Sequence, residues 1–589
     1  MKRLFAGSLM TVLTGAVMVA APQPAEACGG FFCDGGPQPM PVDQTGEDIL
    51  FVMDGDEIEV HIRVEYEGEA ENFAWLIPAS SVPTDFNVGS QALVDAVKAA
   101  TVPTYGITNT ADDCSLDDNE GFGTGADGAG DSGDPSGGSA TEGGNDGPVV
   151  LAQEQVGAYE ITVIGEAEGG DLTAQQVFDW LEENEYQQDE SALPIIEEYL
   201  AEDHNFIAIK LTGGADVDEL HPIALKFDHT NPCVPLRLTR IAAVDDMDVR
   251  TYFLSDSRVV PSTYKHVLVN ALKIDWTSQA SNYKEVITKA VDADGADGRA
   301  FVTEYAGPTN VVQTNSIFQS QWNAAEFEGL EPALAMQTLM DQGLFRCDYD
   351  FTVDDDVCFG LHPLIEPLVN EFLVPDDVEP RDFYSDPDQF AELIDLERWA
   401  NGEVFAQRLG ERVIEPGQNA VELLETHDYL TRMYTTISPS EMTADPMFHT
   451  NPDLDDVENN RTATNRLLCN GDNLWTLPDG RDVYVPAGEP WPNIGGEDFW
   501  EEEVDEMPSA GAPMVLVNNT EAIEVARRRY NTGVGYNGVA PEQGGDLDDT
   551  PQPGFDDGGC GCRTSSPTGA VWSMAFLFGI AALRRRRSV

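Results

Sequence analysis

The residues best suited to covalent chemistry in this 589-residue chain are its nine cysteines. Seven stand in the body of the chain, and Cys560 and Cys562 stand near its C-terminus. In an oxidising compartment, a set of this size is expected to form disulfide bonds. Zinc binding is not expected, because no C-x-x-C pair or neighbouring histidine pair accompanies the cysteines.

Spacing favours two disulfide pairs. Cys28 and Cys33 enclose Gly29-Gly30-Phe31-Phe32, and the glycines permit the tight return that a short disulfide loop requires. Cys347 and Cys358 bracket an acidic loop and form the second expected pair.

The other cysteines of the body are odd in number: Cys114, Cys233 and Cys469. We expect Cys114 to pair with Cys233 as the third disulfide. This choice would leave Cys469 without a partner.

Gly533, Gly535 and Gly538 match the dinucleotide-binding pattern G-x-G-x-x-G. A dinucleotide site requires a strand before the motif and a helix after it. Here the motif follows an expected helix that contains Arg527-Arg528-Arg529, and it leads into a glycine-rich segment. We therefore expect no nucleotide binding.

Residues 292–298 (Asp-Ala-Asp-Gly-Ala-Asp-Gly) gather oxygen ligands and glycines as calcium loops do. An EF-hand needs a ligand at its fifth position, Gly at the sixth and Glu at the twelfth. Ala296, Asp297 and Thr303 stand there instead. The segment is expected to be an acidic turn. No cofactor or metal residue is predicted, and calcium is kept as an alternative.

Catalytic motifs are not found. His61 lies on the polar side of an expected strand, and His221 precedes Pro222 in an expected turn. There is no H-E-x-x-H and no G-x-S-x-G nucleophile elbow. The 105 acidic residues give no basis for choosing an acid–base pair. No catalytic residue is predicted, and an enzyme is not the expected outcome.

The first half of the chain predicts an α+β fold with a largely antiparallel sheet and inserted helices. Residues 58–66 alternate apolar and polar side chains, which indicates a strand with one buried face. Residues 73–78 form an apolar run that ends in Pro78, so the two segments are expected to form a hairpin. Further elements are expected as strands at 156–165, 206–211, 223–227, 236–243 and 249–254 and as helices at 173–184 and 193–201. This domain spans 28–260, with a disordered insertion at 115–148.

Beyond residue 260 the apolar period becomes helical, with helices expected before three breakers, Gly343, Pro375 and Gly402. This pattern predicts an α-rich second domain over 261–536. Within it, 429–436 is expected to be a packed helix, followed by a turn at 438–442. Residues 537–559 form a Gly/Pro/Asp linker that is expected to be disordered.

The charge of the chain limits its partners. With 32 basic and 105 acidic residues, the formal net charge is −73, which repels nucleic acid and anionic lipid headgroups. A hydrophobic content of 41% with nine Trp and 26 Phe nevertheless indicates packed domains. The charge is expected to be a solvated surface, since salt screens its self-repulsion.

Both ends of the chain resemble targeting segments. Lys2-Arg3, an apolar stretch at 4–21 and Ala25-Glu26-Ala27 predict a secretory signal peptide at 1–27. Lipidation of Cys28 is an alternative. Residues 567–583 are apolar and reach the lower limit for spanning a hydrocarbon core of roughly 30 Å. Four arginines follow, which hold such an end in the cytoplasm, so we expect a C-terminal transmembrane helix.

Gly559-Cys560-Gly561-Cys562-Arg563, the apolar helix and the arginine cluster together resemble the MYXO-CTERM sorting signal of myxobacterial surface proteins. The resemblance covers about residues 556–589, and we place the signal itself at 560–589. In that family a dedicated protease removes the tail. The resemblance implies that Cys560 and Cys562 are processing and anchoring residues of a protein at the cell surface or outer envelope.

The body of the chain resembles the bacterial family known as domain of unknown function 2330, over about residues 28–260. The segments that carry the resemblance are Ala27–Cys33, Phe73–Pro78, Val156–Tyr159, Trp180–Tyr186 and Leu236–Ala243. Residues 429–442 are similar to long myxobacterial members of the same family. Because the family has no assigned activity, it implies no catalytic residue.

We expect an exported, non-catalytic protein anchored in the envelope, with a structural or interaction role and an unknown extracellular or envelope partner. Its membrane contact is expected only through the C-terminal anchor, with no nucleic acid partner. Two alternatives are a secreted, surface-anchored hydrolase of extracellular polymers and a calcium-dependent adhesion module. A cleft with two carboxylates about 5 to 10 Å apart would favour the hydrolase.

Overall fold

The computed structural model describes residues 44–55, 57–63, 74–112, 148–167, 170, 172–184, 186, 190–212, 220–228, 231–350 and 355–536. Residues 1–541 form one compact unit and residues 542–589 a second, and all described residues belong to the first. The predicted signal peptide, linker and sorting signal lie outside the described residues, as does the predicted insertion apart from Pro148. Among the described residues, no helix combines the length and apolar character needed to cross a membrane.

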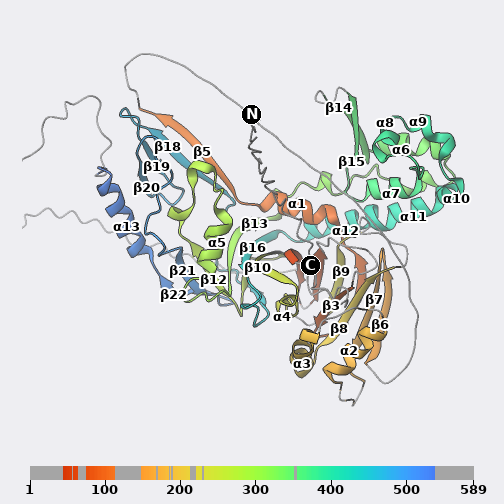
Figure 1. Cartoon of the computed structure of the whole chain (residues 1–589), viewed down its shortest axis with the longest axis horizontal. Coiled ribbons are helices and arrows are strands. Elements are labelled where there is room, and N and C mark those ends of the chain that lie inside the picture. The colour runs from red at the N-terminus through yellow and green to blue at the C-terminus, as the bar shows by residue number, and fades with distance from the viewer. Residues whose placement is uncertain are drawn as a thin grey trace, which may run out of the picture. The chain divides into compact units, whose positions relative to one another are not determined.

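A ten-stranded sheet forms the centre of the first unit (Figure 1). Its strands run in the order β22 (Met514–Asn518), β21 (Glu501–Glu506), β12 (Lys265–Val269), β13 (Ala300–Pro308), β16 (Tyr429–Ile437), β10 (Ala243–Ser255), β1 (Gln44–Asp54), β2 (Glu57–Arg63), β9 (Ile223–Asp228) and β4 (Asp85–Val88). The pairs β1–β10 and β12–β13 are parallel, and the other pairs in this sheet are antiparallel.

Two four-stranded sheets accompany it. One has the order β3 (Ala74–Ala79), β8 (Asn205–Leu211), β7 (Tyr159–Gly165) and β6 (Val149–Val156). The other has the order β20 (Asp482–Val485), β19 (Asn473–Thr476), β18 (Asn460–Leu467) and β5 (Thr104–Ala111). Two-stranded pairs are β11 (Val259–Pro261) with β17 (Phe448–Thr450) and β14 (Phe345–Asp350) with β15 (Asp355–Gly360).

The helices lie between these strands. They are α1 (Gln91–Thr101), α2 (Ala174–Glu183), α3 (Leu193–Ala201), α4 (Leu236–Thr239), α5 (Tyr283–Val291), α6 (Ala335–Asp341), α7 (Ile365–Phe372), α8 (Pro380–Ser385), α9 (Pro387–Phe390), α10 (Leu396–Trp399), α11 (Glu403–Leu409), α12 (Glu415–Thr426) and α13 (Thr520–Gly533). A π-helical turn at Gly410–Ile414 joins α11 to α12. The α+β class with a largely antiparallel sheet is confirmed, and α6 to α12 form a helix-rich segment.

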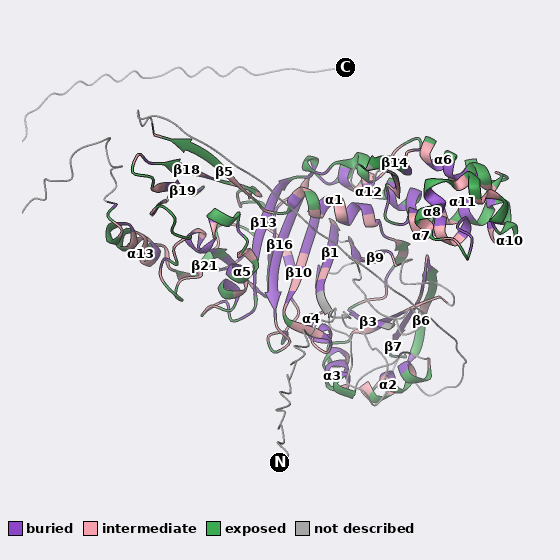
Figure 2. Cartoon of the chain, turned by 45° about the horizontal axis from the view of Figure 1, so that its top comes forward, coloured by how far each residue is buried: buried purple, intermediate pink, exposed green. Residues whose placement is uncertain are grey.

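The central strands are buried on both faces, as Figure 2 shows for β1, β10, β13 and β16. Along β1, Ile49 and Phe51 pack into one hydrophobic cluster, whereas Leu50 and Val52 pack into another. Because successive strand residues point to opposite faces, a continuous apolar run of this kind marks a strand that is covered on both sides.

The predicted hairpin of 58–66 with 73–78 is wrong. β2 pairs with β1 and β9 in the ten-stranded sheet, whereas β3 pairs with β8 in a different sheet. An apolar segment pairs with whichever strand completes its buried surface, and closeness in sequence does not decide the partner.

Two other predicted elements differ from the structure. Residues 236–243 contain the short helix α4, and the strand β10 begins at Ala243. Residues 429–436, predicted as a helix, belong to β16 at the centre of the sheet. The expected boundary near residue 260 falls inside this sheet, between β10 and β12.

Candidate functional site

One face of the ten-stranded sheet carries charged and tyrosine side chains that we call the sheet polar cluster. Along β10, Asp248, Arg250 and Tyr252 point to this face because alternate strand residues share a side. The intervening Val249 and Phe253 pack in a hydrophobic cluster on the other face. The cluster comprises Asp48, Lys98, Tyr105, Asp248, Arg250, Tyr252, Tyr283, Lys284, Glu304, Arg432, Tyr434 and Arg461.

Asp48 of β1 has no solvent exposure. Its carboxylate accepts a hydrogen bond from Lys98 Nζ of α1 at 2.7 Å and another from the Tyr252 hydroxyl at 3.2 Å. Arg250 Nη1 lies 3.9 Å from the same carboxylate. A buried anion needs such partners, because desolvation without them costs several kcal/mol.

Asp248 of β10 occupies the next position of the cluster. It accepts a hydrogen bond from the Tyr434 hydroxyl of β16 at 2.7 Å and forms ion pairs with Arg250 and with Lys284 of α5, whose Nζ lies 2.9 Å away. Arg250 also lies over the Tyr434 ring. These contacts join two strands of the sheet to the helix that covers them.

Glu304 of β13 forms the most deeply buried ion pair of the cluster, with Arg432 of β16. The Tyr283 hydroxyl of α5 donates to the other carboxylate oxygen at 2.8 Å. Burial alone would lower the pKa of Arg432, but Glu304 and Tyr252 more than offset it, so the pKa is raised. Arg432 Nη1 also donates to the Lys98 carbonyl oxygen at 3.1 Å.

The sheet polar cluster is a closed arrangement. Its three carboxylates all have cationic partners, and burial raises the pKa of Tyr252, Tyr283 and Tyr434, whose hydroxyls stay protonated. A general base needs a free proton-accepting position within reach of a substrate. These side chains therefore hold strands and helices together rather than act on a ligand.

Thr303, His266 and Asp505 form a second polar group, in which a hydroxyl, an imidazole and a carboxylate follow one another as nucleophile, base and acid do in a catalytic triad. His266 Nε2 of β12 lies 3.1 Å from Thr303 Oγ1 of β13, and His266 Nδ1 lies 3.9 Å from Asp505 Oδ2 of β21. Arg258 Nη2 donates to Thr303 Oγ1 at 3.2 Å. Sequence reasoning missed this group because its members come from four separate segments.

Burial argues against catalysis at this second group. Thr303 is 4% exposed and lies on an inner strand between β12 and β16, so a substrate carbonyl has no path to its hydroxyl. Burial lowers the pKa of His266, opposed by its contact with Asp505. The imidazole is therefore neutral at pH 7, and the group serves as a buried polar contact between three strands.

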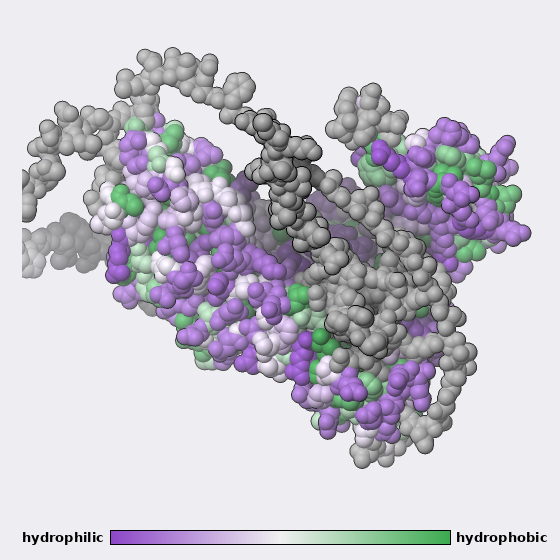
Figure 3. Space-filling model, in the orientation of Figure 1, coloured by the Kyte–Doolittle hydropathy of each residue, from purple (hydrophilic) through white to green (hydrophobic). Residues whose placement is uncertain are grey.

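The candidate binding site that is exposed to solvent lies at one end of the ten-stranded sheet, where β22 is the terminal strand. Three consecutive apolar side chains, Met514, Val515 and Leu516, are 55%, 48% and 45% exposed. Figure 3 shows a mainly hydrophilic surface with small hydrophobic areas over the part of the molecule that contains β21 and β22. Exposed apolar side chains on an unpaired strand edge favour pairing with another chain.

A groove of 440 Å³ opens beside β22. Its lining residues are Ser262, Thr263, Tyr264, Lys265, Glu506, Met507, Pro508 and Met514. They include a single carboxylate, Glu506, which pairs with Lys265. We call the groove together with Met514, Val515 and Leu516 the β22 edge surface.

The loop that precedes β22 is held in place by hydrogen bonds to Asn451 and Asp453. Asn451 is fully buried, and its Nδ2 donates to the Pro508 carbonyl oxygen at 2.7 Å and to the Gly511 carbonyl oxygen at 3.1 Å. Asp453 accepts from the Gly511 N–H at 2.8 Å. These bonds preorganise the β22 edge surface, which lowers the entropy cost of binding.

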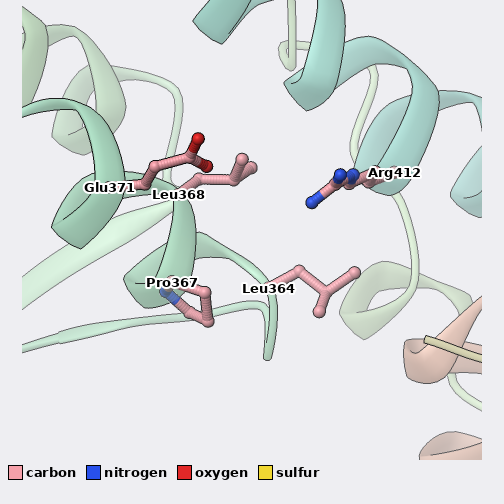
Figure 4. Close-up of a pocket in the computed structure, with 5 residues that line it drawn as sticks. All are labelled: Leu364, Pro367, Leu368, Glu371 and Arg412. Atoms are coloured by element: carbon pink, nitrogen blue, oxygen red, sulfur yellow. The ribbon is translucent and has the colours of Figure 1, made fainter. Parts of the chain in front are cut away.

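A second cavity lies in the helix-rich segment between α7 and the π-helical turn (Figure 4). Leu364, Pro367, Leu368, Glu371 and Arg412 line it, and its volume is 10 Å³. A cavity of this size accommodates at most one water molecule. It is a packing gap rather than a ligand site.

The predicted acidic turn near residue 292 lies at the end of α5. Asp292 hydrogen-bonds to Glu441, with Asp246 nearby. Burial and the charge of Asp246 raise the pKa of Asp292, and burial and the charges of Asp292 and Asp246 raise the pKa of Glu441. Within the described residues, no group of three or more His, Cys, Asp or Glu side chains has the arrangement that would hold a metal ion. Two carboxyl groups in hydrogen-bond contact are also closer than the hydrolase geometry requires.

The structure confirms the Cys347–Cys358 disulfide, which joins register partners of β14 and β15. The predicted Cys114–Cys233 disulfide is wrong, because Cys233 is a free thiol. Cys469 is disulfide-bonded. Cys28, Cys33, Cys114, Cys560 and Cys562 lie outside the described residues.

Cys233 is a partly buried free thiol. It lies beside Met447 and close to Asp445 and Arg237, and burial raises the pKa of its thiol. Arg237 Nε donates to Asp445 Oδ2 at 2.9 Å and stacks on the Tyr199 ring. The raised pKa lowers the fraction of reactive thiolate at neutral pH.

Both singled-out histidines are buried, which contradicts the expected position of His61 on the polar side of its strand. His61 lies beside Glu59 inside the sheet. His221 accepts a hydrogen bond from the Ala158 N–H at 3.1 Å, and burial lowers its pKa to about 4. The Gly533–Gly535 motif follows helix α13, as expected, and so lacks the preceding strand of a dinucleotide site.

Comparison with solved structures finds a crystal structure of a mutated baculovirus P35 after caspase cleavage. It is 11% identical, covers 39% of this chain and 80% of that chain, and has a TM-score of 0.22, so it supports no conclusion about fold or function. A comparison with curated proteins finds no match.

Comparison with protein families gives a specific result. The family described as "Uncharacterized protein conserved in bacteria (DUF2330)" matches residues 22–317. This range includes β1 to β13 and extends past the residues that carried the resemblance in the sequence. The chain belongs to the DUF2330 family.

Proposed function

We propose that the protein is an exported, non-catalytic interaction protein that is held at the cell envelope by its C-terminal segment and binds its partner through the β22 edge surface. The observation that carries the interaction role is the row of exposed apolar side chains on a terminal strand beside a 440 Å³ groove. Adjacent exposed apolar side chains on an unpaired strand edge favour association with another chain.

Export and anchoring rest on the two ends of the sequence. An apolar stretch after Lys2-Arg3 supports a signal peptide, and the Cys560/Cys562 pair before an apolar segment and four arginines supports sorting to the envelope. The disulfide between Cys347 and Cys358 agrees with an oxidising compartment.

The location is tested by separating the cell envelope of the native organism and measuring the intact mass of the protein. We expect a surface-bound form that lacks residues 1–27 and is processed near Cys560. A full-length chain in the cytoplasmic fraction would contradict export. An uncut tail in the inner membrane would contradict the sorting role of the two cysteines.

The interaction role is tested with a photo-crosslinking amino acid at position 515 in intact cells. We expect one discrete crosslinked species, whose partner mass spectrometry then identifies. The matched control places the same amino acid at Leu396, which is also exposed but lies in the helix-rich segment. Equal crosslinking from both positions, or none from position 515, would overturn the proposal.

A further inference from the structure

The edge of β22 has free backbone groups as well as apolar side chains. β22 pairs with β21 through Glu506–Met514, Asp505–Val515, Val504–Val517 and Glu503–Asn518, and it has no neighbour on its outer side within the described sheet. In an antiparallel strand, alternate residues direct their N–H and C=O groups away from the paired neighbour. An extended segment can hydrogen-bond to these groups and add a further strand.

Residues 514–517 of this edge lack the charged side chains that usually prevent such pairing. Natural edge strands carry charged residues or prolines that prevent association, whereas residues 514–517 read Met-Val-Leu-Val. The bulge in this pair lies in β22, where Leu516 is an extra residue between Val515 and Val517, the partners of Asp505 and Val504. Residues Met514–Asn518 still form one strand. The partner therefore presents an apolar, extended segment.

The acidic residues next to β22 indicate the charge that the partner segment carries. β21, immediately inside β22, reads Glu-Glu-Glu-Val-Asp-Glu over residues 501–506. Glu502 pairs with Arg481 and Glu506 pairs with Lys265. Glu503 accepts a hydrogen bond from the Asn518 amide, and burial together with the charges of Asp505 and Glu502 raises its pKa.

A strand added outside β22 would lie about 10 Å from β21, since neighbouring strands are about 4.8 Å apart. Lysine and arginine side chains can extend over one strand, so basic residues in the partner would reach Glu503. Two copies of this chain would instead bring two acidic strands together, and each copy already has a net charge of −73. Like charges opposed in this way destabilise an interface.

We propose that the β22 edge surface binds an extended segment of a partner protein in which apolar and basic residues alternate, added as an eleventh strand on the sheet. This inference rests on the proposed interaction function and specifies the partner chemistry. The groove beside Met514 accepts an apolar side chain at one end of the added strand.

The test measures binding of fluorescent synthetic peptides to the purified full-length protein by anisotropy. One peptide alternates valine with lysine and a second alternates valine with glutamate. A third is the basic peptide with alternate backbone nitrogens methylated. We expect the basic peptide to bind at least about tenfold more tightly than each of the other two, and to weaken as salt rises.

Variants then locate the site. Val515→Lys with Leu516→Lys should reduce binding of the basic peptide at least about tenfold. The matched control, Val525→Lys, changes an exposed valine on helix α13 and should leave binding unchanged. Equal thermal melting of all variants shows that they fold.

Several outcomes would overturn the inference. Equal affinity for acidic and basic peptides would exclude the charge argument, and insensitivity to backbone methylation would exclude strand addition. Self-association in sedimentation that Val515→Lys abolishes would make a second copy the occupant. If position 515 still crosslinks in cells while no peptide binds, only the partner chemistry fails; if neither occurs, the interaction function fails as well.

Discussion

The sheet polar cluster and the β22 edge surface belong to the same ten-stranded sheet and use side chains in opposite ways. In the cluster, the carboxylates are largely buried and each has a cationic partner. At the edge, apolar side chains are exposed and the outer backbone groups have no strand partner. The same sheet thus buries polar side chains in the cluster and exposes apolar side chains at its edge.

Because of this difference, side chains of the cluster are expected to affect the stability of the fold, and side chains of the edge are expected to affect binding. Removing one member of a buried ion pair leaves the other charge unpaired in a low-dielectric interior, and the fold loses stability. Changing an exposed apolar side chain leaves the fold nearly unchanged but alters what the surface can bind. Substitutions in the two regions should therefore affect different measurements.

The largest effect is expected from Glu304→Gln, which leaves the Arg432 guanidinium buried without its counter-charge. We expect the free energy of unfolding to fall by about 3 to 5 kcal/mol. Urea unfolding followed by circular dichroism measures this change. The double variant Glu304→Gln/Arg432→Met should recover part of the loss, because it removes both charges. A loss below about 1 kcal/mol in the single variant would show that the Glu304–Arg432 ion pair does not stabilise the fold as we describe.

The two regions also differ in how far sequence could predict them. The strand at residues 58–62 was visible from its alternation, but its partners β1 and β9 were not, because pairing depends on segments distant in sequence. β16 carried a detectable signal in its composition, because Tyr429–Ile437 is rich in the β-favouring residues Tyr, Thr and Ile.

The candidate sites were harder to predict from the sequence than the strands. Glu304 and Arg432 are 128 positions apart, and neither has a distinctive local motif. The β22 edge had a signal in the apolar run Met514–Val517, which follows the acidic strand 501–506 after a loop at 507–513. Its exposure could not be predicted, because the same run would also suit a buried strand.

A pH titration probes the interior through His221. Burial holds its folded pKa at about 4 against an ordinary value of 6.5, so the native state favours the neutral ring. Its contribution to stability is present above pH 6.5 and is lost as pH falls towards 4, by about 3 kcal/mol. The variant His221→Gln should show a shallower fall in unfolding free energy over this range. An unchanged pH profile would contradict the buried, neutral state.

The Cys347–Cys358 disulfide stabilises a hairpin outside both regions. Its cysteines are 11 positions apart, and a closed loop of this length is worth about 3 kcal/mol in the chain-entropy account. We expect the double variant Cys347→Ser/Cys358→Ser to lower the melting temperature without changing peptide binding at β22. A binding defect in this variant would mean that the regions are coupled.

Cys469 tests whether a second disulfide fastens the β5–β18 pair. β5 ends at Ala111, the register partner of Leu467, and Cys114 follows three positions later in the sequence. We therefore expect Cys114 to be the partner of Cys469. Peptide mapping under non-reducing conditions should recover a crosslinked peptide that contains both, whereas a peptide that joins Cys469 to Cys28 or Cys33 would contradict the assignment.

The smallest effect on stability is expected at the edge itself. Val515→Lys places a charge on a half-exposed position, so the free energy of unfolding should change by no more than about 0.5 kcal/mol. Val504→Lys, on the adjacent strand but fully buried, is the matched contrast and should cost several kcal/mol, because an unpaired charge enters the core. If Val515→Lys proves as destabilising as Val504→Lys, the edge is covered in the folded protein and cannot be the binding surface. If only Val504→Lys destabilises, any loss of binding in Val515→Lys is a property of the surface, because the fold beneath it is intact.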